Sequence, residues 1–305
     1  ITVHEQGLET MQAMVEEAFV FQKQAYIAVN PAIVSDIESA FTPPEFDNTR
    51  SHKLESSLAK DPVLRSFVDT NVAEHKNPAY GIVTISLKPV GLTPGDASSD
   101  QMRVIADLAE LYSHDELRIS HEQNIILPHV RRADIPKVQK ALAEIGLATA
   151  NVGLISDIIA CPGMDYCALA TARSIPVAQQ ISTRFNELKL EQEIGPLKLK
   201  ISGCINACGH HHVGHIGILG LDKGGVESYQ ITLGGDGSEN TSIGERVGPG
   251  FAASEVVGAV EVLIETYLSI RKSDSEAFLE TFRQVGMEPF KRALYPEGKG
   301  SRYAA

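Results

Sequence analysis

The side chains of this sequence most able to do chemistry are its four cysteines, Cys161, Cys167, Cys204 and Cys208. They form two pairs, with five residues between the first two and three between the last two. Thiolates from two loops suit an iron–sulfur cluster or a zinc ion, because soft sulfur ligands select these metals over hard cations. Structural zinc sites usually separate paired cysteines by about two to four residues, so the first pair fits zinc less well. The spacing indicates a metal or cluster site.

Two other interpretations of the cysteines are weaker. A disulfide framework is typical of small secreted domains and not of a chain of 305 residues. Buried, inert cysteines occur singly in many cores, but here every cysteine falls in one of two short motifs. We therefore expect thiols that are kept reduced for a metal, and with them a cytoplasmic location.

The residues around the cysteines narrow the choice between an iron–sulfur cluster and a zinc ion. Cys161-Pro-Gly-Met-Asp-Tyr-Cys167 and Gly203-Cys-Ile-Asn-Ala-Cys-Gly209 closely resemble the siroheme and [4Fe–4S] binding motifs of the sulfite/nitrite reductase hemoprotein family. The resemblance extends over about residues 80–295, and the cysteine motifs are its most specific part. Three flanking stretches agree with it: Lys200-Ile-Ser-Gly203, His210-His-His-Val-Gly-His-Ile-Gly217 and the hairpin His121-Glu-Gln-Asn-Ile-Ile-Leu127.

This resemblance implies a [4Fe–4S] cluster bound by the four cysteines, and a siroheme. Cys208 would also be the axial thiolate of the siroheme iron, so that one sulfur joins the two cofactors. Asn206, Gln123 and Asn124 would contact the siroheme or the cluster. The implied reaction is the six-electron reduction of sulfite to sulfide or of nitrite to ammonia, with electrons from a ferredoxin or a flavoprotein.

Several polar residues near these motifs have structural interpretations as well. Asn206 would suit a turn residue with positive φ, and a hairpin needs polar residues such as Gln123 and Asn124 in any case. Lys198 and Lys200 alternate with apolar residues, which predicts that both face outward from a half-exposed strand. Four histidines follow the second cysteine pair and resemble a metal site: His210, His211, His212 and His215. Clustered histidines are more often structural residues than metal ligands.

The elements that must position these motifs follow from the periodicity of apolar residues. Residues 80–150 predict the order strand, helix, strand, strand, helix, with a last strand near residues 148–154, which is a ferredoxin-like unit. A capping box of Ser98 and Gln101 begins its first helix. We expect an α+β chain of three parts: a helical and linker segment at 1–77, a ferredoxin-like half-domain at 78–150, and a mixed α/β siroheme/[4Fe–4S]-binding domain at 151–305.

Inside the last part, the first cysteine pair is expected at a helix start. A helix at 177–188 and a strand at 197–201 are expected to separate it from the second pair. Strands at 216–221 and 229–233 and helices at 255–271 and 276–285 complete the pattern. In the first sixty residues, a helix is expected from Leu8 to Val29 and is stopped or interrupted by Pro31.

Composition excludes several partners. The chain carries 27 Lys and Arg against 39 Asp and Glu, a net charge of −12, which argues against nucleic acid and against anionic membranes. It has no apolar run long enough to span a bilayer. Because the resemblance covers only one half of the family's proteins and the first residue is Ile1, we expect a C-terminal half, either a separate domain or a truncated product. Two alternatives stay open: an iron–sulfur or zinc electron-transfer or binding module without siroheme, and an apo fragment.

Overall fold

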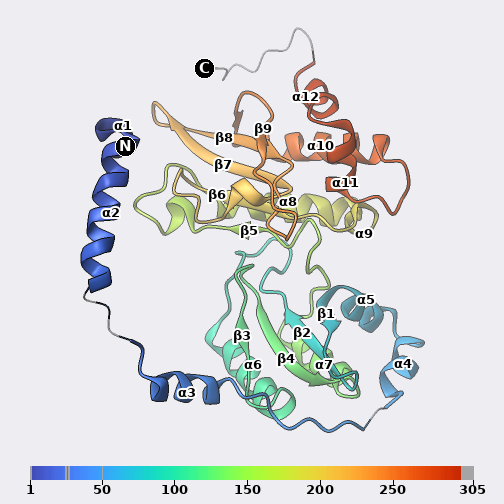
Figure 1. Cartoon of the computed structure of the whole chain (residues 1–305). Coiled ribbons are helices and arrows are strands. Elements are labelled where there is room, and N and C mark those ends of the chain that lie inside the picture. Colours follow the sequence, from blue (N-terminus) through green and yellow to red (C-terminus); the bar gives the residue numbers. More distant parts are fainter. Residues whose placement is uncertain (1, 25, 27, 50, 297–305) are drawn as a thin grey trace. The chain divides into compact units, whose positions relative to one another are not determined.

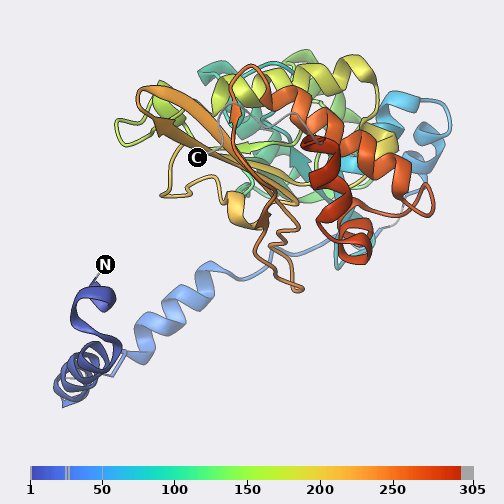
Figure 2. The same cartoon turned by 90° about the horizontal axis from the view of Figure 1, so that it is seen from above.

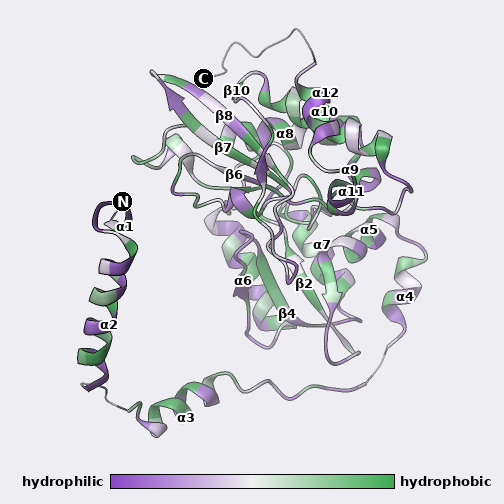
Figure 3. Ribbon diagram, turned by 45° about the horizontal axis from the view of Figure 1, so that its top comes forward, coloured by the Kyte–Doolittle hydropathy of each residue, from purple (hydrophilic) through white to green (hydrophobic). Residues whose placement is uncertain are grey.

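The computed structural model (Figure 1) describes residues 2–24, 26, 28–49 and 51–296. The chain divides into two compact units, Ile1–Phe46 and Asp47–Ala305. The first unit consists of three helices, α1 (Thr2–Gln6), α2 (Leu8–Gln24) and α3 (Pro31–Ala40), and none of them buries a residue. Figure 3 shows hydrophilic and hydrophobic bands along α2 and α3. No described helix combines the length and the hydropathy needed to cross a membrane.

The boundary between α2 and α3 corrects one expectation. The predicted helix ends at Gln24, five residues before Val29, and Pro31 begins a helix instead of stopping one. Asn30 caps α3, since its side chain accepts a hydrogen bond from the N–H of Ala32 at 3.0 Å. The fixed φ of proline suits the first turn of a helix, where its missing N–H removes no hydrogen bond.

The first sheet of the second unit is antiparallel, with the strand order β1-β2-β4-β3. Its expected elements appear in the expected order, and Ser98 and Gln101 form the predicted capping box. Residues 148–154 form no strand, so the expected last strand is wrong; the fourth strand precedes the others. The elements are α4 (Lys53–Leu58), α5 (Pro62–Asn71), β1 (Val72–Glu74), β2 (Tyr80–Ile85), α6 (Ser99–Tyr112), β3 (Arg118–Ile119), β4 (Ile125–Arg131) and α7 (Ile135–Glu144).

The core of this sheet lies between its strands and the helices α5, α6 and α7. Val83 and Ile85 of β2 and Leu127 of β4 are fully buried against Phe67 of α5 and Leu142 of α7. The apolar side chains of β2 and β4 give these strands their green colour in Figure 3. Alternation along the strands places one face on the helices, as the period of two predicts.

The second sheet has six strands in the order β10-β8-β7-β6-β5, and β9 pairs with β8. Strands β5, β6 and β7 are parallel, while β7 and β8 form an antiparallel hairpin, so the sheet is mixed. This confirms the expected α+β class. The elements are β5 (Ile159–Ala160), η1 (Gly163–Asp165), α8 (Ile175–Leu188), α9 (Glu191–Ile194), β6 (Leu199–Ser202), η2 (His211–Val213), β7 (Ile216–Lys223), β8 (Val226–Leu233), β9 (Glu245–Arg246), β10 (Phe251–Ala252), α10 (Val256–Ile270), α11 (Phe278–Val285) and α12 (Glu288–Leu294).

Helices α8 and α10 pack side by side on this sheet, as Figures 1 and 2 show. Leu199 and Ile201 of β6 belong to the core that the sheet forms with the helices. Lys198 is exposed as expected, but Lys200 and Ser202 are buried, so the expected outward direction of Lys200 is wrong. Alternate residues of a strand point to opposite faces, so Lys200 and Ser202 share the face away from the helical core. Strand β6 is therefore covered on both faces.

Candidate functional site

The first cysteine of each pair lies at the carboxyl end of a strand in the second sheet. Cys161 directly follows β5, and Cys204 follows β6 after one residue, Gly203. Because β5 and β6 are parallel neighbours, these ends lie side by side. The N–H of Cys161 donates to the carbonyl of Ile201 at 3.1 Å, and Cys161 Sγ accepts a hydrogen bond from the N–H of Gly203 at 3.0 Å. The sheet thus brings one cysteine of each pair together, and both are buried.

The second cysteine of each pair lies in a loop. Cys167 is half-buried and Cys208 is exposed. The expected helix start at the first pair is wrong, since only the short turn η1 separates Cys161 from Cys167, and α8 begins at Ile175. In the described residues, no three His, Cys, Asp or Glu side chains are close enough together to hold a metal ion. The structure therefore places the two buried cysteines at adjacent strand ends. It does not bring all four thiols of the described chain together at one metal site.

Two glycines allow the second cysteine loop to pack closely against neighbouring backbone, Gly209 against β6 and Gly203 against the segment that contains Ala172. A Cβ at Gly209 would lie 1.9 Å from the carbonyl oxygen of Ile201, and one at Gly203 would lie 2.6 Å from that of Ala172. Only glycine permits so close an approach of two backbones. Asn206 lies in a turn, closed by a hydrogen bond from the N–H of Ala207 to the carbonyl of Cys204 at 3.1 Å. The residue with positive φ in this loop is Ala207, with φ 56°, so the expected positive φ of Asn206 is wrong. Asn206 itself is exposed.

We expect Gly209→Ala to destabilise the chain by about 2 kcal/mol or more, because the added methyl group must displace the loop or the strand. Gly258→Ala is the matched control, since a Cβ at this helical position meets nothing within 4 Å. It is expected to leave stability unchanged or raise it by about 0.5–1 kcal/mol. Urea unfolding of the two variants measures the difference, and equal stabilities would show that the loop does not depend on this close approach.

Buried polar atoms without partners lie next to the second cysteine pair. Ser202, two residues before Cys204, is fully buried, and its Oγ has no hydrogen-bond partner among the described residues. The same holds for Nδ1 of His211, three residues after Cys208. Buried polar groups are nearly always hydrogen-bonded, so such atoms point to a polar ligand. The four thiols, together with the unpartnered Ser202 Oγ and His211 Nδ1, fit a cofactor that is bound through cysteine sulfur and carries polar substituents.

The hairpin residues predicted to contact siroheme are held by the protein. The side chain of Gln123 pairs with the backbone of Ala160, donating at 2.8 Å and accepting at 3.1 Å. Asn124 is buried; its Oδ1 accepts from the N–H of Leu87, and its Nδ2 donates to Asp157 Oδ1, both at 3.1 Å. Gln123 therefore fixes the hairpin to Ala160 of β5, the residue before Cys161, and Asn124 fixes it to Leu87 and Asp157. Their contact with siroheme stays a prediction.

A cavity of about 810 Å³ adjoins these residues. Pockets of about 300–1,000 Å³ are typical of cofactor and ligand sites. Its wall is formed by the hairpin, the first cysteine loop and apolar side chains of the first sheet and its helix, including Gln123, Asn124, Pro162, Tyr166, Met102 and Ile119.

A buried ion pair behind the hairpin was missed by the sequence analysis. Lys88 Nζ lies 2.6 Å from Asp157 Oδ1, and the two side chains are 2% and 5% exposed. Lys88 also donates to the carbonyl of Glu122, and Asp157 Oδ2 accepts from the N–H of Gly153 at 2.9 Å. No sequence signal marks this pair, because a lysine after a strand and an aspartate in a turn-rich stretch look like surface residues.

The histidines after the second cysteine pair do not gather into one site. His215 accepts a hydrogen bond on Nδ1 from the N–H of Lys198 at 3.2 Å, which requires this nitrogen to be unprotonated. Burial, together with repulsion from Lys198, Arg283 and Lys200, lowers the pKa of His215 to about 4, against attraction from Asp236. His215 is therefore a neutral structural residue at neutral pH.

This lowered pKa predicts a pH dependence of stability. The unfolded chain takes up the proton of His215 at its ordinary pKa, so the folded state is fully stabilised above about pH 6.5 and loses stability as the pH falls toward 4. We expect His215→Asn, whose Oδ1 replaces the Nδ1 acceptor, to remove about 1–3 kcal/mol of this loss. The measurement is urea unfolding at pH 7 and pH 5. Exposed His4, changed to Asn, is the control and should keep the wild-type slope.

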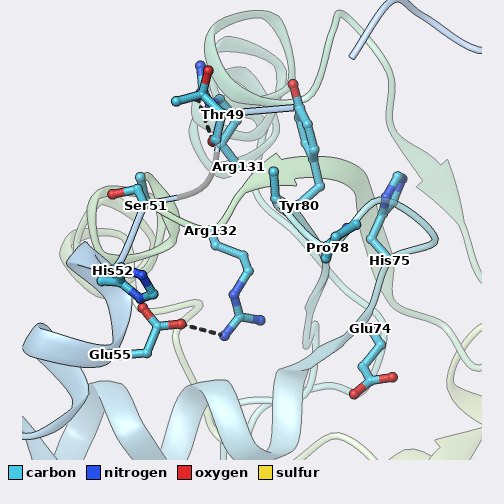
Figure 4. A pocket seen from close by; sticks show the side chains of 12 residues that line it. Thr49, Ser51, His52, Glu55, Glu74, His75, Pro78, Tyr80, Arg131 and Arg132 are labelled. Carbon is cyan, nitrogen blue, oxygen red and sulfur yellow. Dashed lines mark hydrogen bonds and ion pairs between the residues drawn. The ribbon is translucent and has the colours of Figure 1, made fainter. Parts of the chain in front are cut away.

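A second cavity, of about 400 Å³, lies in the first sheet's region and is lined by none of the predicted site residues. Figure 4 shows Arg131 and Arg132 at its wall, with Arg132 directed toward Glu55. The ion pairs Arg131–Asp47, at 2.7 Å, and Arg132–Glu55, at 3.3 Å, compensate both guanidinium charges. Among the described residues of this wall, both arginines are thus already paired with a carboxylate, which weakens the attraction of the cavity for an anion.

Comparisons with known proteins agree with this geometry. The nitrite/sulfite reductase ferredoxin-like half domain matches residues 76–145, and the nitrite and sulphite reductase 4Fe-4S domain matches residues 153–299. The ferredoxin–nitrite reductase of Synechococcus elongatus is 29% identical over 182 residues, which are 57% of this chain and 34% of that protein. Sulfite reductase [ferredoxin] 1 of Mycolicibacterium paratuberculosis is 24% identical over 238 residues, 75% of this chain and 41% of that protein.

Two solved structures share the fold. The NirA protein of Mycobacterium tuberculosis gives a TM-score of 0.60 at 20% identity, over 72% of this chain and 41% of that one. A dissimilatory sulfite reductase, DsrI, gives 0.57 at 13% identity, over 74% and 73%. The chain spans about a third of the length of the first curated relatives. The 4Fe-4S domain and the matched reductases imply siroheme and a [4Fe–4S] cluster as cofactors. The chain therefore belongs to the sulfite/nitrite reductase hemoprotein family.

Proposed function

We propose that this chain is the C-terminal, cofactor-binding half of an assimilatory-type reductase that converts nitrite to ammonia or sulfite to sulfide in a six-electron reaction. The observation that carries the proposal is the placement of Cys161 and Cys204 at adjacent carboxyl ends of β5 and β6, within the segment that matches the 4Fe-4S domain. Parallel strand ends are a frequent place for ligand sites in mixed sheets.

In this proposal, Cys161, Cys167, Cys204 and Cys208 would hold the [4Fe–4S] cluster, and Cys208 would also bind the siroheme iron. When bound, the cluster and the siroheme supply the electron transfer and the reduction chemistry. The exposed Cys208 and half-buried Cys167 are the two ligands that must move toward the buried pair. The N–H of Gly203 donates to Cys161 Sγ, and such a hydrogen bond to sulfur tunes a sulfur-ligated centre.

The protein's other groups position this site. Gln123 holds the hairpin to Ala160, and the Lys88–Asp157 pair holds the same hairpin through Glu122 and Asn124. We infer that the siroheme occupies the adjoining cavity, where Gln123 and Asn124 form part of the wall. Asn206 is exposed on the second cysteine loop and is free to approach a bound cofactor.

The remaining parts of the proposal concern the complete enzyme. Its substrate is sulfite or nitrite, and its electron donor is a ferredoxin or a flavoprotein; the names of the relatives support ferredoxin. We propose a cytoplasmic location, where thiols stay reduced. The division at residues 1–77, 78–150 and 151–305 also stays a proposal. Because the chain spans about a third of its relatives, turnover requires the rest of the enzyme.

The test is to purify the chain anaerobically, measure iron and acid-labile sulfide, and record its absorption spectrum. A [4Fe–4S] cluster with siroheme predicts about five irons, four from the cluster and one from siroheme, with about four acid-labile sulfides per chain and siroheme absorption bands. Iron and sulfide without siroheme bands, after reconstitution with siroheme as well, would favour the alternative of an electron-transfer module. Zinc, or no metal after reconstitution, would reject the proposal for this chain.

A further inference from the structure

The hydroxyl group of Ser174 is buried against the first cysteine of the site. Ser174 is fully buried at the N-cap of α8, and its Oγ lies 3.3 Å from Cys161 Sγ. A serine at the N-cap normally accepts a hydrogen bond from a backbone N–H of the first helical turn, but Ser174 makes no such bond. Among the described residues, Cys161 is the only hydrogen-bond partner of this hydroxyl. The hydroxyl is thus directed at the sulfur and not at the helix.

The state of the sulfur decides which atom donates in this contact. A neutral thiol and a hydroxyl can each donate, so in the apo chain either atom can carry the shared hydrogen. A cysteine sulfur that binds a metal has lost its proton and can only accept. With a metal-bound Cys161, the hydroxyl of Ser174 is therefore the donor. The same sulfur then accepts a second hydrogen bond, from the N–H of Gly203 at 3.0 Å.

The segment 171–174 holds this hydroxyl between the two cysteine loops. The N–H groups of Thr171 and Ala172 donate to the carbonyl of Gly203 in the second loop, at 2.9 Å and 3.0 Å. In the first loop, the N–H of Met164 donates to the carbonyl of Ala172 at 3.1 Å. A Cβ on Gly203 would lie 3.0 Å from Ser174 Oγ, so the second loop packs directly on the hydroxyl. Both loops therefore fix the place of Ser174.

Arg173 ties the same segment to the sheet. Its N–H donates to Glu227 Oε2 at 2.9 Å, and its guanidinium group pairs with the same carboxylate. Its Nε also lies 3.6 Å from Asp165 Oδ1 in the first cysteine loop. The buried Tyr229 of β8 places its hydroxyl 2.8 Å from the carbonyl of Arg173 and 2.7 Å from Glu227 Oε2. The backbone that carries Ser174 is thus held from the sheet as well as from the loops.

We propose that Ser174 is a positioning residue for the bound cluster: its hydroxyl donates a hydrogen bond to Cys161 Sγ and raises the reduction potential of the centre that this sulfur ligates. The inference rests on the proposed function, which supplies the cluster. Reduction adds negative charge to an iron–sulfur cluster and its thiolates. A donor directed at the sulfur stabilises that charge more in the reduced state than in the oxidised state. Ser174 thereby favours the uptake of an electron by the cluster.

The first measurement uses the reduced apo chain and needs no cofactor. The S–H stretching band of Cys161 is recorded by Raman spectroscopy and is assigned by its loss in Cys161→Ser. We expect Ser174→Ala to shift this band, because hydrogen bonding changes the frequency of an S–H bond. Ser182→Ala is the matched control, since Ser182 is also buried in α8 but its hydroxyl contacts the backbone of Gln179 and Gly91. A Cys161 band that stays in place in Ser174→Ala would overturn the proposal.

The second measurement is the reduction potential of the anaerobically reconstituted chain, followed by electron paramagnetic resonance. At a fixed potential, we expect Ser174→Ala to lower the ratio of reduced to oxidised cluster about three- to tenfold, because one hydrogen bond to sulfur is lost. At about 59 mV per tenfold change for one electron, the midpoint falls by about 30–60 mV. Ser174→Thr keeps the hydroxyl and should restore most of the wild-type value. Ser182→Ala should keep the wild-type midpoint.

A spectroscopic signature separates hydrogen bonding from packing. By electron–nuclear double resonance, the reduced wild-type cluster should couple to one more exchangeable proton than the cluster of Ser174→Ala, and Ser182→Ala should match the wild type. Equal midpoints and equal proton couplings in wild type and Ser174→Ala would overturn the role of Ser174 and leave the proposed function standing. A wild type that takes up no iron and sulfide would overturn the proposed function, and the role of Ser174 with it. Should Ser174→Ala fail to fold, Ser174→Gly replaces it in each measurement with the same expectations.

Discussion

Cys161→Ser is expected to reduce bound iron and acid-labile sulfide, measured after anaerobic reconstitution, to less than about a tenth of the wild-type content. Cys161 lies at the end of β5, and its buried Sγ already receives the N–H of Gly203, so this sulfur is the one most firmly placed for the proposed cluster. A serine oxygen is a poor substitute, because iron–sulfur clusters select thiolate ligands. Cys204→Ser, at the end of the neighbouring strand, is expected to have the same effect.

Met164→Ser is the matched control for this prediction. Met164 lies between Cys161 and Cys167 in the same loop and is 45% exposed, so its replacement changes the loop without removing a thiol. Its iron and sulfide content should equal that of wild type. If Cys161→Ser retained full iron and sulfide while folding normally, the cluster would not be bound by the predicted cysteines, and the proposed function would lose its main support.

The part of the site that sequence could predict is its chemistry. Cysteine type and spacing led to the metal site, and the residues around Cys161 and Cys204 led to the family, because these features depend on few neighbouring residues. Local rules also predicted most strands and helices, including the capping box of Ser98 and Gln101. These predictions hold because apolar period, capping and turn chemistry act within a few residues of the chain.

What sequence could not predict depends on contacts between distant segments. The strand that pairs with β2 comes from residues 72–74 and not from 148–154, since edge strands are decided by which segment reaches the sheet. Alternation of Lys198 and Lys200 with apolar residues suggested an exposed face, but the segment after Cys208 and the hairpin cover it, and Lys200 is buried. The same limit hid the Lys88–Asp157 pair, whose partners are 69 residues apart.

Asp157→Asn is expected to destabilise the chain by about 3–5 kcal/mol, because it leaves Lys88 charged, buried and without a counter-charge. The substitution also replaces one carboxylate oxygen by an NH₂ group. Both oxygens of Asp157 accept hydrogen bonds, Oδ1 from Lys88 and Asn124 and Oδ2 from Gly153, so one donor must face another donor. Urea unfolding measures the loss. Asp134→Asn, which breaks the exposed Lys137–Asp134 pair, is the control and should cost about 0.5 kcal/mol or less.

A double-mutant cycle separates the ion pair from its surroundings. Lys88→Met combined with Asp157→Asn removes the unpaired charge, so the double variant should be more stable than Asp157→Asn alone. The pair also anchors the hairpin through the carbonyl of Glu122, and Gln123 beside it receives the N–H of Ala160 at 3.1 Å. Hydrogen exchange of the Ala160 amide should therefore speed up in Asp157→Asn and not in Asp134→Asn. Unchanged exchange would show that the hairpin holds β5 without this ion pair, so that the end of the strand carrying Cys161 is fixed by the sheet alone.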